Sequence, residues 1–156
     1  MAAVSEPNRD AFYAAQIERD RTLLAAREVE DALSRAVGGE NWVHELKSSL
    51  ASLKDAMSAE ERELDRPGSL LTLISAEHPR RFGPRIRGIK DQYNDIIRQL
   101  ESIRRELDGW DREEGDLGDI RHRAGWVILA LQNCRNRQAD LVFEAIGLDL
   151  GKNRDG

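Results

Sequence analysis

The sequence predicts an all-α protein: an up-down-up-down four-helix bundle with a short extra helix between the second and third long helices. Apolar residues recur at spacings of three and four over long segments, which is the period of one helix face. The glycines and the prolines at positions 7, 67, 79 and 84 lie mostly between those segments. Four amphipathic helices joined by mostly short loops bury their apolar stripes most simply in such a bundle.

The first long helix is expected from about Asn8 to Val37. Pro7 stands near its start and Gly38-Gly39 follow its end, the usual arrangement of proline at entry and glycine past the end. This helix has the least regular apolar stripe of the four. The stripe consists of Tyr13, Ile17, Leu24, Val29, Leu33 and Ala36.

The second long helix is expected to begin near Asn41. Ser58-Ala-Glu-Glu61 has the form of a capping box and predicts a kink or restart before Arg66, and Pro67-Gly68 end the helix. A short apolar helix around Leu70 to Ser75 should then cover one end of the core. The inward face of the second helix consists of Trp42, Leu46, Leu50, Leu53 and Met57.

The third long helix, Pro84 to Leu107, has the clearest signal of all. Its apolar residues alternate steps of three and four without interruption, which makes a narrow seam that packs against nearly antiparallel neighbours. A seam only partly covered within one chain could instead pair with a second copy, and this coiled coil is the alternative interpretation. The seam consists of Ile86, Ile89, Tyr93, Ile96, Leu100, Ile103 and Leu107.

The fourth long helix, about Leu117 to Ile146, follows the acidic loop Asp111 to Asp116, and Gly147 should end it. Its inward stripe consists of Ile120, Ala124, Val127, Leu131, Cys134, Gln138, Leu141 and Ala145. All 156 residues are expected to form one domain, with a core from about 8 to 148 and a flexible tail at 149–156.

The composition narrows the possible compartments and partners. Twenty-four Lys and Arg against 29 Asp and Glu give a net charge of −5, which disfavours binding to nucleic acid or to anionic lipid. The single cysteine, Cys134, gives no disulfide framework and fits a reducing cytoplasm. No leader pattern and no run of 18 or more apolar residues is present, so we expect a cytoplasmic protein without membrane association.

His44, in "HELKSS", is the first candidate for reaction chemistry. It resembles the phosphoacceptor histidine of sensor kinases and phosphotransfer domains, in which a lysine three residues on, here Lys47, balances the charge. Ser48 and Ser49 stand where those patterns usually have glycine and proline. His44 also lies about 200° around the helix from the core stripe, where a solvated residue is ordinary. Phosphotransfer is therefore an alternative hypothesis.

The inward stripes also carry polar and sulfur-containing side chains. Met57, Tyr93, Cys134 and Gln138 fall on the faces that three different helices turn toward the core. Buried Tyr and Gln need hydrogen-bond partners, so they are expected to meet each other or a trapped water. Core packing is the favoured interpretation, and a small pocket for a metal or ligand is the alternative.

A basic cluster lies at the start of the third helix, with no acidic residue among the eleven positions from 80 to 90. It could bind a phosphate or an acidic protein surface, although a solvated face is the simpler interpretation. Glycine-rich phosphate loops and serine or cysteine nucleophile motifs are lacking. The cluster consists of Arg80, Arg81, Arg85, Arg87 and Lys90.

Three stretches together resemble bacterial, largely actinobacterial, hemerythrin-like (HHE-type) four-helix proteins. They are "LLAAREVEDALSRAVGGENWVHELKSSLASLKDAM", "RPGSLLTLISAEHPRRFGPRIRGIKDQYNDIIRQLESI" and "RNRQADLVFEAIGLDLG". The resemblance implies the bundle, and it implies inward histidines and carboxylates that bind two irons. Met57, Tyr93 in "IKDQYNDI" and Cys134 in "QNCRNRQ" stand where such ligands are expected. Thioether, phenol and thiol groups are poor replacements for imidazoles at such irons.

The sequence therefore predicts a metal-free, cofactor-free and non-catalytic bundle that acts through contact with a partner protein or with a second copy. The third helix and the basic cluster are the predicted contact surfaces. Phosphotransfer through His44 and residual ligand binding in the core are the alternatives.

Overall fold

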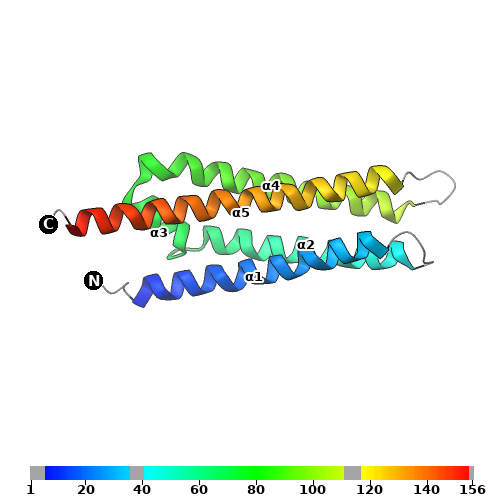
Figure 1. Cartoon of the computed structure of the whole chain (residues 1–156), viewed down its shortest axis with the longest axis horizontal. Coiled ribbons are helices and arrows are strands. Elements are labelled where there is room, and N and C mark those ends of the chain that lie inside the picture. Colours follow the sequence, from blue (N-terminus) through cyan, green and yellow to red (C-terminus); the bar gives the residue numbers. More distant parts are fainter. Residues whose placement is uncertain (1–5, 36–40, 111–116, 155–156) are drawn as a thin grey trace.

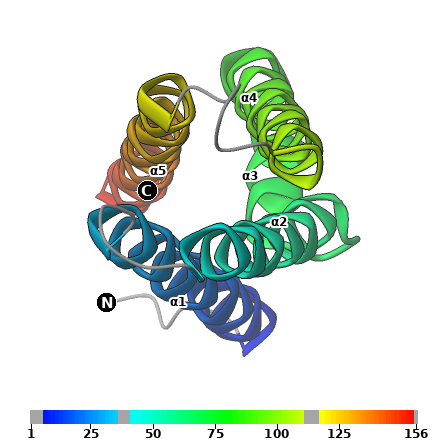
Figure 2. The same cartoon turned by 90° about the vertical axis from the view of Figure 1, so that its right-hand side faces the viewer.

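A computed structural model describes residues 6–35, 41–110 and 117–154, and these residues form five helices. They are α1 (Glu6–Arg35), α2 (Trp42–Asp65), α3 (Leu70–Glu77), α4 (Pro79–Asp108) and α5 (Leu117–Arg154). Each long helix runs antiparallel to the next one along the chain (Figure 1). Seen end-on, α1, α2, α4 and α5 surround a common centre in that order (Figure 2). The predicted four-helix bundle with a short extra helix is confirmed.

The apolar stripes predicted for the second, third and fourth long helices are buried at every position. Because all seven stripe residues of α4 lie inside the chain's own core, that helix has no uncovered seam for a second copy. The alternative of a coiled coil through this helix is therefore wrong. The α4 residues in the core are Ile86, Ile89, Tyr93, Ile96, Leu100, Ile103 and Leu107.

The connection between α2 and α4 is tight and well capped. Gly68 has φ +83°, a conformation that favours glycine, and it turns the chain after α2. The buried Ser69 side chain donates to the Leu64 carbonyl at 3.0 Å and accepts from the Thr72 amide at 3.4 Å, so it caps α3. The short helix predicted around Leu70 is confirmed.

Three helix boundaries differ from those predicted. α2 continues through Ser58, so the predicted capping box and the restart of the helix before Arg66 are wrong. α4 begins at Pro79 because proline fits the first helical turn, and Pro84 lies one turn inside. α5 continues past Gly147, where Leu148 packs against the core, and the predicted tail is helical as far as residue 154. The predicted Gly38-Gly39 stop and the acidic loop 111–116 lie outside the described residues.

α1 is rotated relative to its predicted stripe. Val29 is buried as expected, but Tyr13 is 70% exposed and Leu24 is 61% exposed, and Ile17 also faces solvent. Small side chains allow α1 to approach α2 closely, whereas large ones would hold the two helices apart. The buried face of α1 consists of Ala11, Thr22, Ala25, Ala26, Val29 and Ala32.

The rotation of α1 predicts how two substitutions on this helix will differ. Ala32→Leu should lower the free energy of unfolding by about 1–3 kcal/mol, because the buried small-residue contact has no room for the larger side chain. Leu24→Ala should change it by less than about 0.5 kcal/mol, because Leu24 is exposed. Urea denaturation followed by circular dichroism measures both values, and a larger loss for Leu24→Ala would contradict this packing.

Candidate functional site

A buried carboxylate lies at the centre of the bundle. Glu60 of α2 is only 3% exposed, and its Oε2 atom lies 2.7 Å from the hydroxyl of Thr22, which is fully buried on α1. The Thr22 hydroxyl is also 3.0 Å from the Glu18 carbonyl. The carboxylate is the closer and more strongly accepting partner, so the Thr22 hydrogen compensates part of the cost of burying Glu60.

The same network continues through α4 and α5. The Gln138 side-chain amide donates to the Tyr93 hydroxyl at 2.8 Å and lies 3.9 Å from the sulfur of Cys134. Burial raises the pKa of Tyr93 well above its usual value, and the neighbouring Glu60 carboxylate raises it further. The phenol is therefore neutral, and its hydrogen can serve the carboxylate of Glu60. Each long helix contributes at least one member to the network.

The core residues named from the sequence are largely brought together. Tyr93, Gln138 and Cys134 are neighbours, and Met57 is buried one turn before Glu60 on α2. Sequence reasoning missed Glu60 and Thr22. The signal for Glu60 was present, because the spacing of three and four that ends at Met57 continues to residues 60 and 64.

The donors at the bundle centre do not fit a pair of iron ions. Such a site in a four-helix bundle needs several carboxylates and histidines that converge, whereas the network has a single carboxylate, Glu60, with hydroxyl, amide and thiol groups around it. Among the described residues, no three His, Cys, Asp or Glu side chains lie close enough together to hold a metal ion. The network is chemically suited to fixing helices in register.

His44, the predicted phosphoacceptor, is an exposed residue on α2. Lys47, which would balance a phosphoryl group there, forms an ion pair with Asp108 of α4. Its ammonium group lowers the pKa of Asp108 by hydrogen bonding and by charge. Lys47 thus links α2 to α4 through this ion pair. Phosphotransfer through His44 stays a prediction.

The basic cluster is largely engaged within the chain. Arg81 donates to Glu144 of α5 at 2.7 Å, Arg85 pairs with the same carboxylate, and the two guanidinium groups lower the pKa of Glu144. Lys90 pairs with Asp65 of α2. Only Arg80 and Arg87 of the cluster have no ion pair among the described residues, so little charge is left for an acidic partner.

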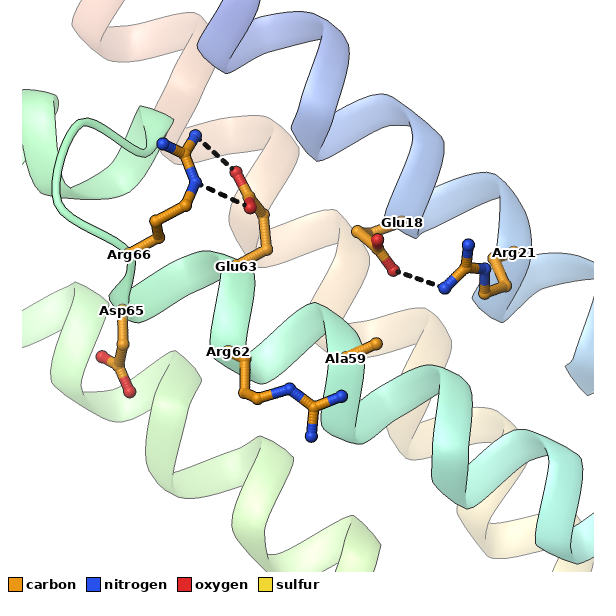
Figure 3. Close-up of a pocket in the computed structure, with 7 residues that line it drawn as sticks. All are labelled: Glu18, Arg21, Ala59, Arg62, Glu63, Asp65 and Arg66. Carbon is orange, nitrogen blue, oxygen red and sulfur yellow. Dashed lines mark hydrogen bonds and ion pairs between the residues drawn. The ribbon is translucent and has the colours of Figure 1, made fainter.

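A charged hollow lies between α1 and α2, and ion pairs within the chain also engage the side chains that line it. Figure 3 shows the Arg66 guanidinium forked onto the Glu63 carboxylate, with contacts of 2.9 and 3.0 Å, and Glu18 facing Arg21 at 3.5 Å. Acidic and basic side chains alternate around it and neutralise one another. The hollow is therefore a solvated groove between two helices rather than a site for a charged ligand.

The remaining candidate is the surface over α1 and α5, called the α1–α5 face below. Every large apolar side chain that is strongly exposed in the described residues lies on these two helices. Phe143 is 81% exposed and Leu129 is 66% exposed. The apolar residues of the face are Phe12 and Leu23 on α1, and Trp126, Leu129, Phe143 and Ile146 on α5. The exposed Leu24 of α1 instead borders the groove between α1 and α2, and Tyr13 and Ile17 lie on the same stripe of α1 as Leu24.

Two arginine side chains bridge the seam between α1 and α5. Arg135 donates to the Arg19 carbonyl at 2.7 Å, and Arg121 donates to the Leu33 carbonyl at 3.1 Å. Two shallow apolar grooves lie on either side of the Arg135 bridge. One is lined by Phe12, Leu70, Val142, Phe143 and Ile146, and the other by Leu33, Gly125, Trp126, Ile128 and Leu129.

Comparison of the chain with protein-family models, curated proteins and solved structures returned no match. The function is therefore inferred from the chain's own residues. None of the helices in the described ranges has the length and apolar character to cross a membrane.

The central network predicts different effects for the chain's two tyrosines. Tyr93→Phe should lower the free energy of unfolding by about 1–3 kcal/mol, because it leaves Gln138 and Glu60 with an unmet hydrogen bond in the core. Tyr13→Phe is the matched control, and its exposed hydroxyl should contribute less than about 0.5 kcal/mol. Chemical denaturation measures both, and equal values would show that the network does not stabilise the fold.

Cys134 should be protected from alkylation in the folded protein. Burial raises the pKa of its thiol to about 11, and only the thiolate is the nucleophile. At pH 8 iodoacetamide should therefore label the native protein far more slowly than the urea-unfolded protein, and native labelling should accelerate as the pH rises toward 11. Mass spectrometry of timed samples gives both rates. Rapid native labelling at pH 8 would contradict the burial of this thiol.

Proposed function

We propose that this chain is a non-catalytic helical bundle that works by binding a protein through the α1–α5 face. The observation that carries the proposal is the location of the strongly exposed large apolar side chains, which lie on two neighbouring helices. Apolar patches of this kind in proteins mark surfaces that bind other proteins, whereas scattered single residues need no explanation. Aromatic anchors such as Phe12, Trp126 and Phe143 commonly dominate binding energy at protein interfaces.

The proposal moves the contact surface away from the third long helix and the basic cluster. The stripe of α4 is buried, and the carboxylates of Glu144 and Asp65 satisfy Arg81, Arg85 and Lys90. Ion pairs exposed to solvent add little affinity, so the apolar face is the better source of binding energy. The resemblance to hemerythrin-like bundles fits this proposal as an ancestry in which the polar network around Glu60 has replaced the iron ligands.

Site-specific photo-crosslinking in cells tests this function. A benzophenone amino acid is placed at Leu129 on the α1–α5 face, with a matched control at Asn94, which is exposed on α4. We expect irradiation to give a discrete crosslinked product from position 129 and none from position 94. Products of equal yield from both positions, or no product from position 129, would contradict a binding role for this face. The mass of the product shows whether the captured protein is another species.

A further inference from the structure

We propose that the bundle opens along the seam between α1 and α5, as two helical hairpins that turn about the seam between α2 and α4. One hairpin consists of α1 and α2, and the other consists of α4 and α5. The α1–α5 seam is then a gate, which is closed in the structure described above. This inference concerns the chain alone and goes beyond the proposed function.

The gate is the seam that no connecting segment of the chain closes. The chain passes from α1 to α2, from α2 through α3 to α4, and from α4 to α5, so each of these neighbours is joined at one end (Figure 1). Around the bundle, α1 and α5 are the remaining neighbours, and they contain the first and the last described residues (Figure 2). Separating two helices that no short segment joins gains more chain freedom than separating two tethered helices.

The opposite seam, between α2 and α4, is held at several levels. Ion pairs join these two helices near both ends and in between, and α3 connects them at one end. Such pairs are individually weak because their side chains are partly exposed. Spread along the seam, they allow a rotation about it more readily than a separation of the two helices. The pairs are Lys47–Asp108, Lys54–Glu101 and Lys90–Asp65.

The polar bridges across the gate have neutral acceptors. Arg135 donates to the Arg19 carbonyl and Arg121 to the Leu33 carbonyl, and a neutral carbonyl accepts less strongly than a carboxylate. In the described part of the chain, neither guanidinium group forms an ion pair, and the buried Nε atom of each has no hydrogen-bond partner. Solvent can meet these Nε–H groups once the gate is open, which offsets part of the cost of exposing apolar surface.

The central network is divided between the same two hairpins. The hydrogen bond from Thr22 to Glu60 lies within the α1–α2 hairpin, and the hydrogen bond from Gln138 to Tyr93 lies within the α4–α5 hairpin. The interaction of the Tyr93 hydroxyl with Glu60 links the two halves. Among the described members of this network, opening breaks that link and leaves the polar pair of each hairpin intact.

Opening the gate also divides both grooves of the α1–α5 face. Phe12 of α1 and Phe143 of α5 line one groove together, and Leu33 of α1 and Leu129 of α5 line the other. A partner that contacts both helices would therefore favour the closed state. This consequence rests on the proposed function, whereas the opening itself does not.

Distances between two spin labels in the purified chain, measured by pulsed electron spin resonance, test the opening. Labels at Asp20→Cys and Ala139→Cys, which are exposed on α1 and α5 beside one groove, span the gate. Labels at Glu28→Cys and Asp55→Cys, which are exposed beside the groove between α1 and α2, are the matched control within one hairpin. We expect a second, longer distance across the gate and a single distance in the control. Mass spectrometry checks that each chain carries two labels.

Substitution of one bridging arginine should shift the populations. Arg135→Met should raise the longer-distance population at least about 5-fold, because it removes the bridge to α1 and keeps an apolar stem of similar length. Arg137→Met is the matched control, since Arg137 donates to Gln92 within the α4–α5 hairpin, and it should leave the population unchanged. A single, unchanged distance across the gate with and without Arg135→Met would overturn the inference. An equal rise with Arg137→Met, or a second distance in the α1–α2 control, would also overturn it, because either result indicates a general loosening of the fold.

The same measurements separate this inference from the proposed function. Two distances across the gate in a chain that gives no crosslink from position 129 support the opening and contradict the binding role. One unchanged distance across the gate, in a chain that does crosslink from position 129, supports the binding role and overturns the opening.

Discussion

The burial of the Glu60 carboxylate is the constraint on which the arrangement of the long helices depends. A carboxylate in an apolar core must be met by donors, and here the donors come from other helices. Thr22 of α1 lies 2.7 Å away, and Tyr93 of α4, itself held by Gln138 of α5, lies beside it. Apolar stripes tolerate a shift of one turn between helices, because one aliphatic side chain can replace another. A hydrogen-bonded chain through all four long helices does not tolerate such a shift.

The same constraint determines which side of α1 faces solvent. Thr22 reaches Glu60 only if its side of α1 is turned inward, and this rotation buries the small side chains that share that side, including Ala25, Ala26 and Ala32. The large apolar residues near Tyr13 and Leu24 are then directed outward by the geometry of the helix. The Thr22 contact in the core and the exposed large apolar residues of α1 are thus two consequences of one rotation of α1.

The spacing of the apolar residues correctly predicts the buried faces of α2, α4 and α5, because the regularly spaced large apolar residues of these helices are the residues that the fold buries. It fails for α1 because this helix carries one stripe of large apolar side chains and another of small ones. Which stripe is buried depends on the hydrogen bond between Thr22 and Glu60 of α2. Glu60 itself continues the spacing of the α2 stripe, but a charged residue is normally assigned to the surface. The bridge from α5 to α1 depends on a contact between residues 19 and 135, which no local pattern contains.

The way α5 is fastened to α1 explains why so much apolar surface stays uncovered. Ile128 and Val142 of α5 are buried beside this seam, whereas Phe12 and Phe143 stay exposed at its surface. Arg135 and Arg121 reach across to backbone carbonyls of α1, and the exposed aromatic residues lie outside these bridges. Each guanidinium–carbonyl contact contributes modestly to stability, and the exposed apolar side chains on the surface of the seam contribute little hydrophobic stabilisation within the chain. Covering this face with another protein surface would bury those side chains, which is why the proposed binding role is assigned to it.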